Sequence, residues 1–232
     1  MPAPAEAAPV IAIDGPSGSG KGTISREIAT GLGWHLLDSG ALYRLVALSG
    51  ARAGLADDDV PGHAALARNM VVRFGSRTGG GEQVLLGADR LDVTQLIRSE
   101  TAGMGASRVA AWPEVRAALL ARQRAFAEAP GLVADGRDMG TVVFPDAKLK
   151  IFLTASAEER AHRRYLQLKG SDSTVTLESL AREIAARDHR DMTRPASPLV
   201  PAADAVMLDT TGLSIAEVVE KVHAYVRSRD LE

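Results

Sequence analysis

The residues with the clearest chemical purpose lie in one short segment, GPSGSGKGT. Its glycines can adopt backbone angles that residues with a Cβ resist, so successive N–H groups can curl around an anion. The helix expected to start beside Lys21 adds the positive end of its dipole, and the Lys21 ammonium can reach the terminal phosphates of a nucleotide. We therefore predict a loop that binds nucleotide phosphates. It comprises Gly15, Pro16, Ser17, Gly18, Ser19, Gly20, Lys21, Gly22 and Thr23.

The spacing of this loop departs from the usual GxxxxGK[ST] pattern at one position. Gly15, Gly20 and Lys21 satisfy the pattern, but Gly22 follows the lysine and the hydroxyl comes one residue later, at Thr23. This variant is typical of nucleoside monophosphate kinases, and the sequence lacks the NKxD motif with which GTPases read guanine. The loop alone leaves the acceptor of the phosphate open.

A second candidate cluster follows an apolar segment, in ADGRDMGT at 134–141. Acids at the end of a buried strand resemble the segment that holds magnesium in phosphate-loop proteins, so Asp135 is a candidate for a magnesium contact through water. Arg137 and Asp138 could serve the same site. An acidic surface turn would explain a single such residue, but it explains two acids around an arginine less well.

Arginines give a third signal, because transfer of a phosphoryl group between two anions requires neutralisation of several negative charges. One predicted helix carries three arginines at i, i+3 and i+4, a spacing that places them on one face: Arg160, Arg163 and Arg164. A second helix carries Arg187 and Arg194 and is expected to end before Pro195. The two helices could form a lid over a phosphate site. A solvated face with Glu–Arg pairs is the alternative.

Composition limits the class of protein. A chain of 232 residues that is 46% hydrophobic suits one domain with a small insert or lid. Its net charge of −2 gives no indication of binding to nucleic acid or to a membrane surface. The absence of cysteine excludes disulfides and thiolate metal sites, and fits a reducing compartment. Because we find neither a signal peptide nor an apolar run long enough to cross a membrane, we expect a cytoplasmic protein.

Predicted strands and helices alternate along most of the chain. Apolar segments predict strands at 10–14, 34–40, 132–140, 148–155 and 205–211. Amphipathic segments predict helices at 22–31, 41–54, 94–127 with interruptions, 156–168, 176–191 and 213–228. This alternation after a phosphate loop predicts an α/β fold, a parallel sheet flanked by helices.

Residues 69–92 have a different pattern, in which short segments separated by glycine turns predict antiparallel strands. We assign them to a small strand-rich insert at about 65–105 and place a short lid at about 160–175. Residues 1–8 are expected to be a disordered lead-in, and 9–232 a single kinase domain.

Five segments, taken in order, resemble the bacterial cytidylate kinases. They are GPSGSGKGT, LLDSGALYR (36–44), ADGRDMGTVVFPDA (134–147), ERAHRR (159–164) and RDHRDMTRPASPLVPAADA (187–205). The resemblance extends over nearly the whole chain, and DSGALYR and DGRDMGT are more specific to that family than the phosphate loop. It implies phosphorylation of CMP and dCMP to their diphosphates by ATP, with magnesium held mostly by ATP and water and by no direct protein ligand.

The resemblance also implies a role for each matching residue. The phosphate loop would hold ATP, with Lys21 stabilising the transferred group, and the three clustered arginines would close over the triphosphate. The CMP phosphate would be surrounded by Ser39, Arg44, Arg137 and Arg194. The cytosine edge would be read by Ser107, Arg116 and Asp138, and the ribose contacted by Arg187 and Asp191. The expected partners are these small molecules alone, with no nucleic acid and no membrane, and the protein is expected to be a monomer.

Two other classes remain open from the residues themselves. A small-metabolite kinase of the shikimate or gluconate type would share the phosphate loop but would need an acid or base directed at a hydroxyl group. A non-catalytic nucleotide-binding switch would need the loop alone. The sequence leaves the choice between CMP and dCMP, the use of UMP, the lid movement and any role of His189 undecided.

Overall fold

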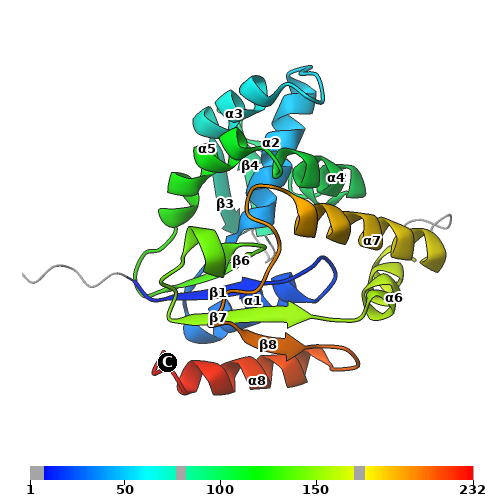
Figure 1. Cartoon of the computed structure of the whole chain (residues 1–232). Helices are drawn as coiled ribbons and strands as arrows, with labels where there is room; N and C mark the ends of the chain where they lie inside the picture. The colour runs from blue at the N-terminus through cyan, green and yellow to red at the C-terminus, as the bar shows by residue number, and fades with distance from the viewer. Residues whose placement is uncertain (1–7, 77–81, 170–175, 232) are drawn as a thin grey trace, which may run out of the picture. The chain divides into compact units, whose positions relative to one another are not determined.

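The structure of the chain is a computed structural model that describes residues 8–76, 82–169 and 176–231. The chain divides into two compact units, coloured along the sequence in Figure 1. Unit 1 comprises Met1–Asp38 and Gln123–Glu232, and unit 2 comprises Ser39–Arg122. The predicted lead-in up to residue 7, the turn at 77–81 and most of the polar loop at 169–174 lie outside the described residues.

Unit 1 is built on a five-stranded parallel sheet in the order β2-β6-β1-β7-β8. Its strands are β1 (Val10–Asp14), β2 (His35–Asp38), β6 (Leu132–Gly136), β7 (Leu149–Thr154) and β8 (Val206–Asp209). In the register of the central strand, Ile13 pairs with Asp135 on β6 and with Ile151 on β7. The predicted parallel α/β sheet is confirmed. The strand predicted at 132–140 is shorter than expected, because Met139–Val143 forms a π-helical turn.

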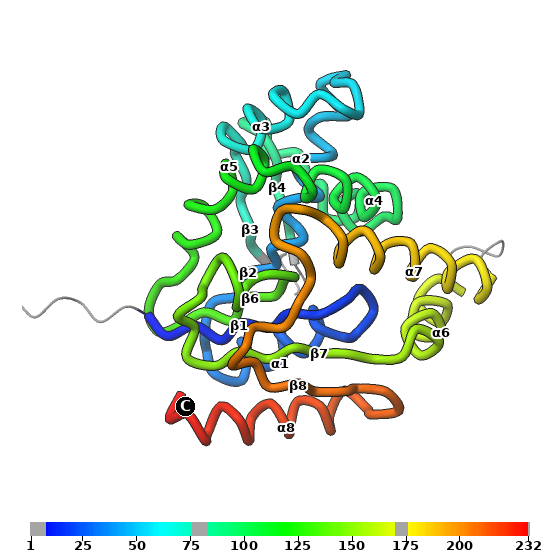
Figure 2. The backbone as a smooth tube through the Cα atoms, viewed as in Figure 1, coloured from blue at the N-terminus to red at the C-terminus, as the bar shows by residue number. Residues whose placement is uncertain are grey.

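The described part of unit 1 also contains α-helices, of which α1 and α8 pack against the sheet. The helices are α1 (Lys21–Leu32), α6 (Ala157–Leu168), α7 (Leu177–Thr193) and α8 (Ile215–Arg227). A core of aliphatic side chains joins α1 and α8 to the sheet through residues such as Ile28, Val222 and Ile151, each almost fully buried. Figure 2 shows α8 running along β8 and α6 beside α7, and the buried Leu180 and Ile184 of α7 pack with Ala161 of α6.

Unit 2 combines helices with the predicted antiparallel strands. The strands β3 (Val72–Ser76), β4 (Glu82–Leu86) and β5 (Leu91–Asp92) form a three-stranded sheet, which confirms the predicted change of pattern. Its helices are α2 (Ser39–Arg52), α3 (Val60–Asn69), the short η1 (Leu96–Arg98), α4 (Glu100–Val109) and α5 (Pro113–Arg124). Gly105 lets α4 approach α2, because a Cβ there would lie 2.8 Å from the Ala47 Cβ.

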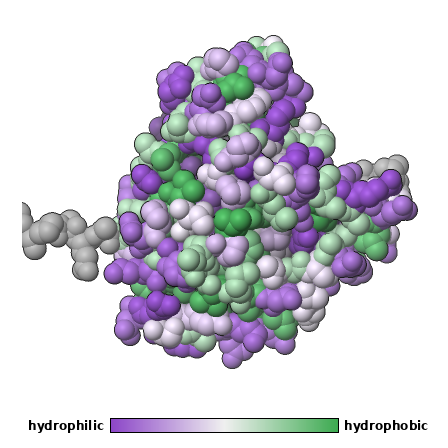
Figure 3. Space-filling view, viewed as in Figure 1, coloured by the Kyte–Doolittle hydropathy of each residue, from purple (hydrophilic) through white to green (hydrophobic). Residues whose placement is uncertain are grey.

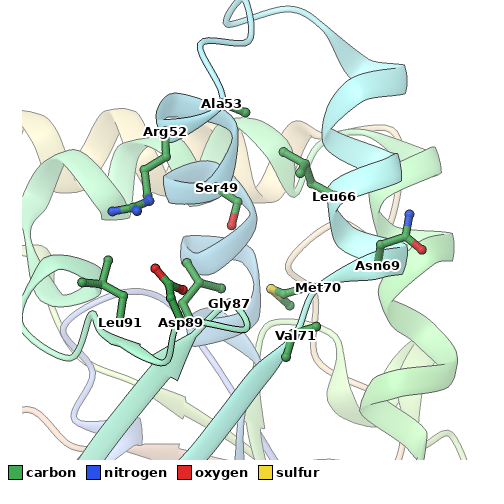
Figure 4. A pocket seen from close by; sticks show the side chains of 11 residues that line it. Ser49, Arg52, Ala53, Leu66, Asn69, Met70, Val71, Gly87, Asp89 and Leu91 are labelled. Atoms are coloured by element: carbon green, nitrogen blue, oxygen red, sulfur yellow. The ribbon is translucent and has the colours of Figure 1, made fainter.

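The surface is mostly hydrophilic on the face shown in Figure 3, with hydrophobic residues in small separate patches. Within the described ranges, no helix combines the length and the apolar character needed to cross a membrane. Unit 2 has an open hollow of about 420 Å³ between α2, α3 and the small sheet, shown in Figure 4. Its lining includes Arg52, Met70 and Asp89, and none of the predicted site residues contributes to it.

Candidate active site

The phosphate loop connects the carboxyl end of β1 to the first residue of α1, as expected. Gly15, Gly18 and Gly20 have φ angles of 147°, 79° and 92°, which L-residues with a side chain rarely adopt. At Gly15 the neighbouring strand also leaves no space, since a Cβ would lie 2.1 Å from the Leu153 carbonyl oxygen. The loop is therefore held against β7 by its backbone, with glycine required by both angle and contact.

Lys21 lies inside this loop rather than extending from it. It is the first residue of α1 and is only 6% exposed, and its Nζ donates a hydrogen bond to the Pro16 carbonyl oxygen at 2.7 Å. The preceding residue, Gly20, provides no side-chain cap for the helix. The amino end of α1 thus combines a lysine ammonium with helix N–H groups that no side chain caps, an arrangement suited to an anion.

Two carboxylates, at the carboxyl ends of β1 and β6, interact electrostatically with Lys21. Asp135 is the penultimate residue of β6, and a Cβ on Gly22 would lie 3.4 Å from its Oδ2. Burial lowers the pKa of Lys21 and raises that of Asp135, while the attraction between the two opposes both shifts. Burial also raises the pKa of Asp14, the last residue of β1, to about 6. The site therefore contains buried ionisable groups whose pKa values are shifted toward the neutral form, a feature common in active sites.

Arg160 on α6 links the phosphate loop to the two arginine-bearing helices, α6 and α7. Its guanidinium donates to the carbonyl oxygens of Ala155 and Ser17, each at 3.1 Å, and forms an ion pair with Asp188 of α7 at 2.6 Å. Both charged side chains are mostly buried, and Arg160 also contributes the atoms nearest to a Cβ built on Gly18. Arg160 therefore contacts the phosphate loop through a backbone carbonyl group, that of Ser17.

Arg163 and Arg164 have different surroundings although they are adjacent. Arg163 pairs with Glu159 at 2.7 Å and donates to the hydroxyl and the carbonyl oxygen of Thr210, at 3.1 and 2.6 Å. Arg164 donates to Gln167 on its own helix at 3.1 Å. The hydroxyl of Thr210 lies 3.3 Å from the Ser19 carbonyl oxygen, so Arg163 is linked to the phosphate loop through Thr210.

The second arginine helix, α7, also reaches the phosphate loop. Arg187 donates to the Ser17 hydroxyl at 3.2 Å, and Asp191 pairs with Arg137 at 3.0 Å. Burial alone would raise the pKa of Asp191, but the Arg137 guanidinium beside it holds that pKa below its usual value. Arg194 caps the end of α7 and donates through Nε to the Ser197 carbonyl oxygen at 2.6 Å. Unit 1 thus hydrogen-bonds Arg160 and Arg187 to the phosphate loop and links Arg163 to it through Thr210.

Asp138 is buried in unit 1 at the N-cap of the turn Met139–Val143, and the other predicted residues belong to unit 2. Ser39 is the buried first residue of α2, and Ser107 is buried on α4. Arg44 donates to the Ile97 carbonyl oxygen at 3.1 Å. Arg116, only 9% exposed, donates to the Ala110 carbonyl oxygen at 3.2 Å, and its guanidinium carbon lies 5.6 Å from the centre of the Tyr43 ring. Arginine and serine side chains are therefore held within this unit by helix packing.

Sequence reasoning missed three residues of these networks. Asp188 received no role, although it neutralises Arg160, and Tyr43 was treated only as part of a helix. Asp14 was treated only as the end of a strand, although two backbone amides from a distant turn donate to its carboxylate. A charged residue that directly precedes the first glycine of the loop and ends an apolar strand is the signal that could have drawn attention to Asp14.

A parallel sheet, a phosphate loop after its first strand and arginines hydrogen-bonded to that loop are the features of a P-loop kinase. A family model described as "Cytidylate kinase" matches residues 11–228. Cytidylate kinase from Pseudomonas entomophila (strain L48) is 58% identical over 225 residues, covering 97% of this chain and 98% of that protein. The same enzyme from Stutzerimonas stutzeri (strain A1501) is 58% identical over 224 residues, covering 96% and 97%. The chain belongs to the cytidylate kinase family, as the resemblance predicted.

Proposed function

We propose that the two anionic substrates of this kinase, ATP and CMP or dCMP, meet at the phosphate loop of unit 1. The activity itself follows from the family: the chain phosphorylates (d)CMP with ATP. The observation that carries the placement is the buried Lys21 inside a loop to which Arg160 of α6 and Arg187 of α7 are hydrogen-bonded at Ser17.

The donor side of the proposed site is the loop with the arginines of α6. The backbone N–H groups of the phosphate loop, other than at Pro16, would bind the phosphates of ATP, and Lys21 would exchange its hydrogen bond to Pro16 for one to the transferred group. Arg160, Arg163 and Arg164 would neutralise the triphosphate. For Arg160 and Arg163 this requires a change of partner, because in the structure both guanidinium groups are hydrogen-bonded to carbonyl oxygens and paired with carboxylates.

The residues proposed for the acceptor side are those that the family resemblance implies. We propose that Arg137 and Arg194, with Ser39 and Arg44, bind the CMP phosphate, and that Arg187 and Asp191 contact the ribose. For the base we propose Ser107, Arg116 and Asp138. A carboxylate accepts from the cytosine amine and an arginine donates to the ring nitrogen and carbonyl, whereas uracil would turn a carbonyl toward the carboxylate.

The chemistry needs charge neutralisation more than proton transfer. The acceptor oxygen of a nucleoside monophosphate is already ionised, so the chain need not supply a general base. Positioning and electrostatic stabilisation then account for the rate, and both are functions of Lys21 and the arginines. Closure of the arginine helices, the proposed lid, would exclude water and favour transfer to CMP over hydrolysis.

Magnesium fits the donor set at the end of β6. Asp135 offers a partly buried carboxylate beside the amino end of α1, and Thr23 offers an exposed hydroxyl on the first turn of that helix. Both are oxygen donors of the kind that magnesium prefers, and we propose that they hold the ion mainly through water. When bound, the ion would neutralise phosphate charge.

We also propose that the protein acts as a monomer in the cytoplasm.

A coupled assay of ADP release tests the choice of acceptor. CMP and dCMP should support turnover, while UMP, AMP and shikimate should support much less. Turnover with shikimate alone would indicate a small-metabolite kinase, and nucleotide binding without turnover would indicate a switch. Either result would contradict the proposal.

Asp138→Asn tests the assignment of the base site. We expect kcat/KM for CMP to fall about 100-fold, because the amide turns a donor toward the cytosine amine, while ATP affinity changes little. Asp146→Asn, at an exposed position in the same segment, is the matched control. Equal losses for CMP and ATP would place Asp138 on the magnesium or donor side instead.

A further inference from the structure

Asp14 is a buried carboxylate to which the proposed chemistry assigns no function. It ends β1, is 4% exposed, and precedes the first glycine of the phosphate loop. Its Oδ1 accepts a hydrogen bond from the Met139 backbone N–H and its Oδ2 accepts one from the Gly140 N–H, both at 2.8 Å. Both oxygens of one side chain are thus used by two consecutive amides that lie 125 and 126 residues away in the sequence.

These two amides begin the π-helical turn Met139–Val143. The first N–H groups of a helical turn have no partner within it and need an acceptor from elsewhere. Asp138 occupies the N-cap position, where an aspartate side chain commonly provides that acceptor, but it makes no side-chain capping bond here. Asp14 therefore performs the capping from another strand, and the Asp138 side chain is not used for it.

Asp14 also connects two segments whose relative position matters for the proposed mechanism. Gly15 begins the phosphate loop one residue after Asp14, while Arg137 and Asp138 directly precede the amides that it binds. The fit is close at Gly140, where a Cβ would lie 3.5 Å from Asp14 Oδ2 and 3.2 Å from the Lys150 side chain. The turn can therefore shift little without disturbing the carboxylate.

We propose that Asp14 is a positioning residue that clamps the turn after Asp138 and so fixes Arg137 and Asp138 relative to the phosphate loop. The proposal rests on the acceptor-side roles given above to Arg137 and Asp138. It gives a function to a carboxylate whose burial opposes ionisation, the pKa of Asp14 being raised to about 6 mainly by that burial. An asparagine of the same size would accept one N–H and turn its NH₂ toward the other.

Amide hydrogen exchange, followed residue by residue by NMR, tests the clamp directly. In the wild-type protein the Met139 and Gly140 amides should be protected. In Asp14→Asn, which keeps one acceptor oxygen, exchange of at least one of these two amides should accelerate at least about tenfold, while amides of β7 stay as slow as before. Fast exchange of both amides in the wild-type protein would overturn the proposal before any variant is made.

Steady-state kinetics then test whether the clamp serves the acceptor. Asp14→Asn should lower kcat/KM for CMP about 10- to 100-fold, because misplaced groups lose their geometry for the substrate, and should change KM for ATP by less than about threefold. Asp59→Asn is the matched control, since Asp59 also accepts a backbone N–H, from Gly62 at the start of α3, and belongs to no proposed site. It should leave both constants unchanged.

The double variant Asp14→Asn/Asp138→Asn separates failure of this inference from failure of the base assignment. If Asp14 acts by positioning Asp138, Asp14→Asn should lower kcat/KM for CMP much less in the Asp138→Asn variant than in the wild-type protein. Full additivity, or a loss shared equally by CMP and ATP, would overturn the positioning role. If Asp138→Asn alone has no effect on CMP, the base assignment fails, and the exchange result still decides whether the clamp exists.

Discussion

The phosphate loop and the arginine helices α6 and α7 meet in unit 1, but they are built in opposite ways. In the loop the backbone carries the geometry: three glycines adopt positive φ angles, and the buried Lys21 bonds to a loop carbonyl. In the helices side chains carry it, through ion pairs such as Arg160 with Asp188 and through the contact of Arg163 with Thr210.

This difference indicates how each region can respond to a substrate. A backbone loop whose angles only glycine adopts easily is already shaped for phosphate and has few alternatives. An arginine held by a carboxylate or carbonyl can exchange that partner for a phosphate of similar geometry. We therefore expect substitutions in the loop to abolish function outright, and substitutions in the helices to affect stability and substrate affinity together.

The largest effect is expected from Lys21→Ala. Removal of the ammonium should lower kcat about 10²- to 10³-fold for CMP and dCMP alike, because the lost charge acts on the transferred group rather than on the acceptor. The measurement is the ADP-release assay at saturating CMP and ATP, with Lys221→Ala, exposed on α8, as control. A loss confined to one acceptor would place Lys21 outside the donor side and weaken the contrast between the two regions.

The sequence was sufficient for the loop because its signal is local. Positive φ angles at Gly15, Gly18 and Gly20 require glycine whatever surrounds them, and the start of α1 at Lys21 follows directly. Helix caps are equally local: Ser156 directly precedes α6, and its hydroxyl accepts a hydrogen bond from the Glu159 N–H. The parallel sheet followed from the alternation of apolar strands and amphipathic helices.

Partners across the fold could not be predicted in the same way. Arg160 meets Asp188 only because α6 packs on α7, and Asp14 meets Met139 only because the chain turns after Gly136 instead of continuing the strand. No spacing rule encodes such contacts, because they depend on tertiary packing. The assignments of Ser107 and Arg116 to the base rest on family resemblance and stay predictions.

Gly18→Ala tests the point where the two regions touch. The substitution should lower the free energy of unfolding by about 1–2 kcal/mol for the backbone angle, and by more because the new Cβ would lie 3.1 Å from the Arg160 Cβ. Gly33→Ala is the matched control, since Gly33 also has a positive φ, of 65°, but no atom near a Cβ. Chemical denaturation measures both. Equal losses in the free energy of unfolding would mean that the Arg160 side chain moves aside at no cost and that its contact does not hold the loop against α6.

The smallest effect, and the sharpest test of the helices, is expected from Arg163→Lys. Lysine keeps the charge but cannot bond to Glu159 and to both oxygens of Thr210 at once, so the free energy of unfolding should fall by about 1 kcal/mol. Arg164→Lys, one residue further on the same helix, should change it by less than about 0.5 kcal/mol, because the hydrogen bond of Arg164 to Gln167 is exposed and joins residues one turn apart.

The kinetic constants of the same two variants separate structure from substrate binding. If both arginines close over the triphosphate, KM for ATP should rise a few-fold in each, whatever the change in stability. A rise for Arg164→Lys alone would mean that Arg163 keeps its bond to Thr210 when ATP is bound, and that α6 contains one structural and one substrate-binding arginine side by side. The exchange of partners proposed for the arginine helices would then be limited to Arg160 and Arg164.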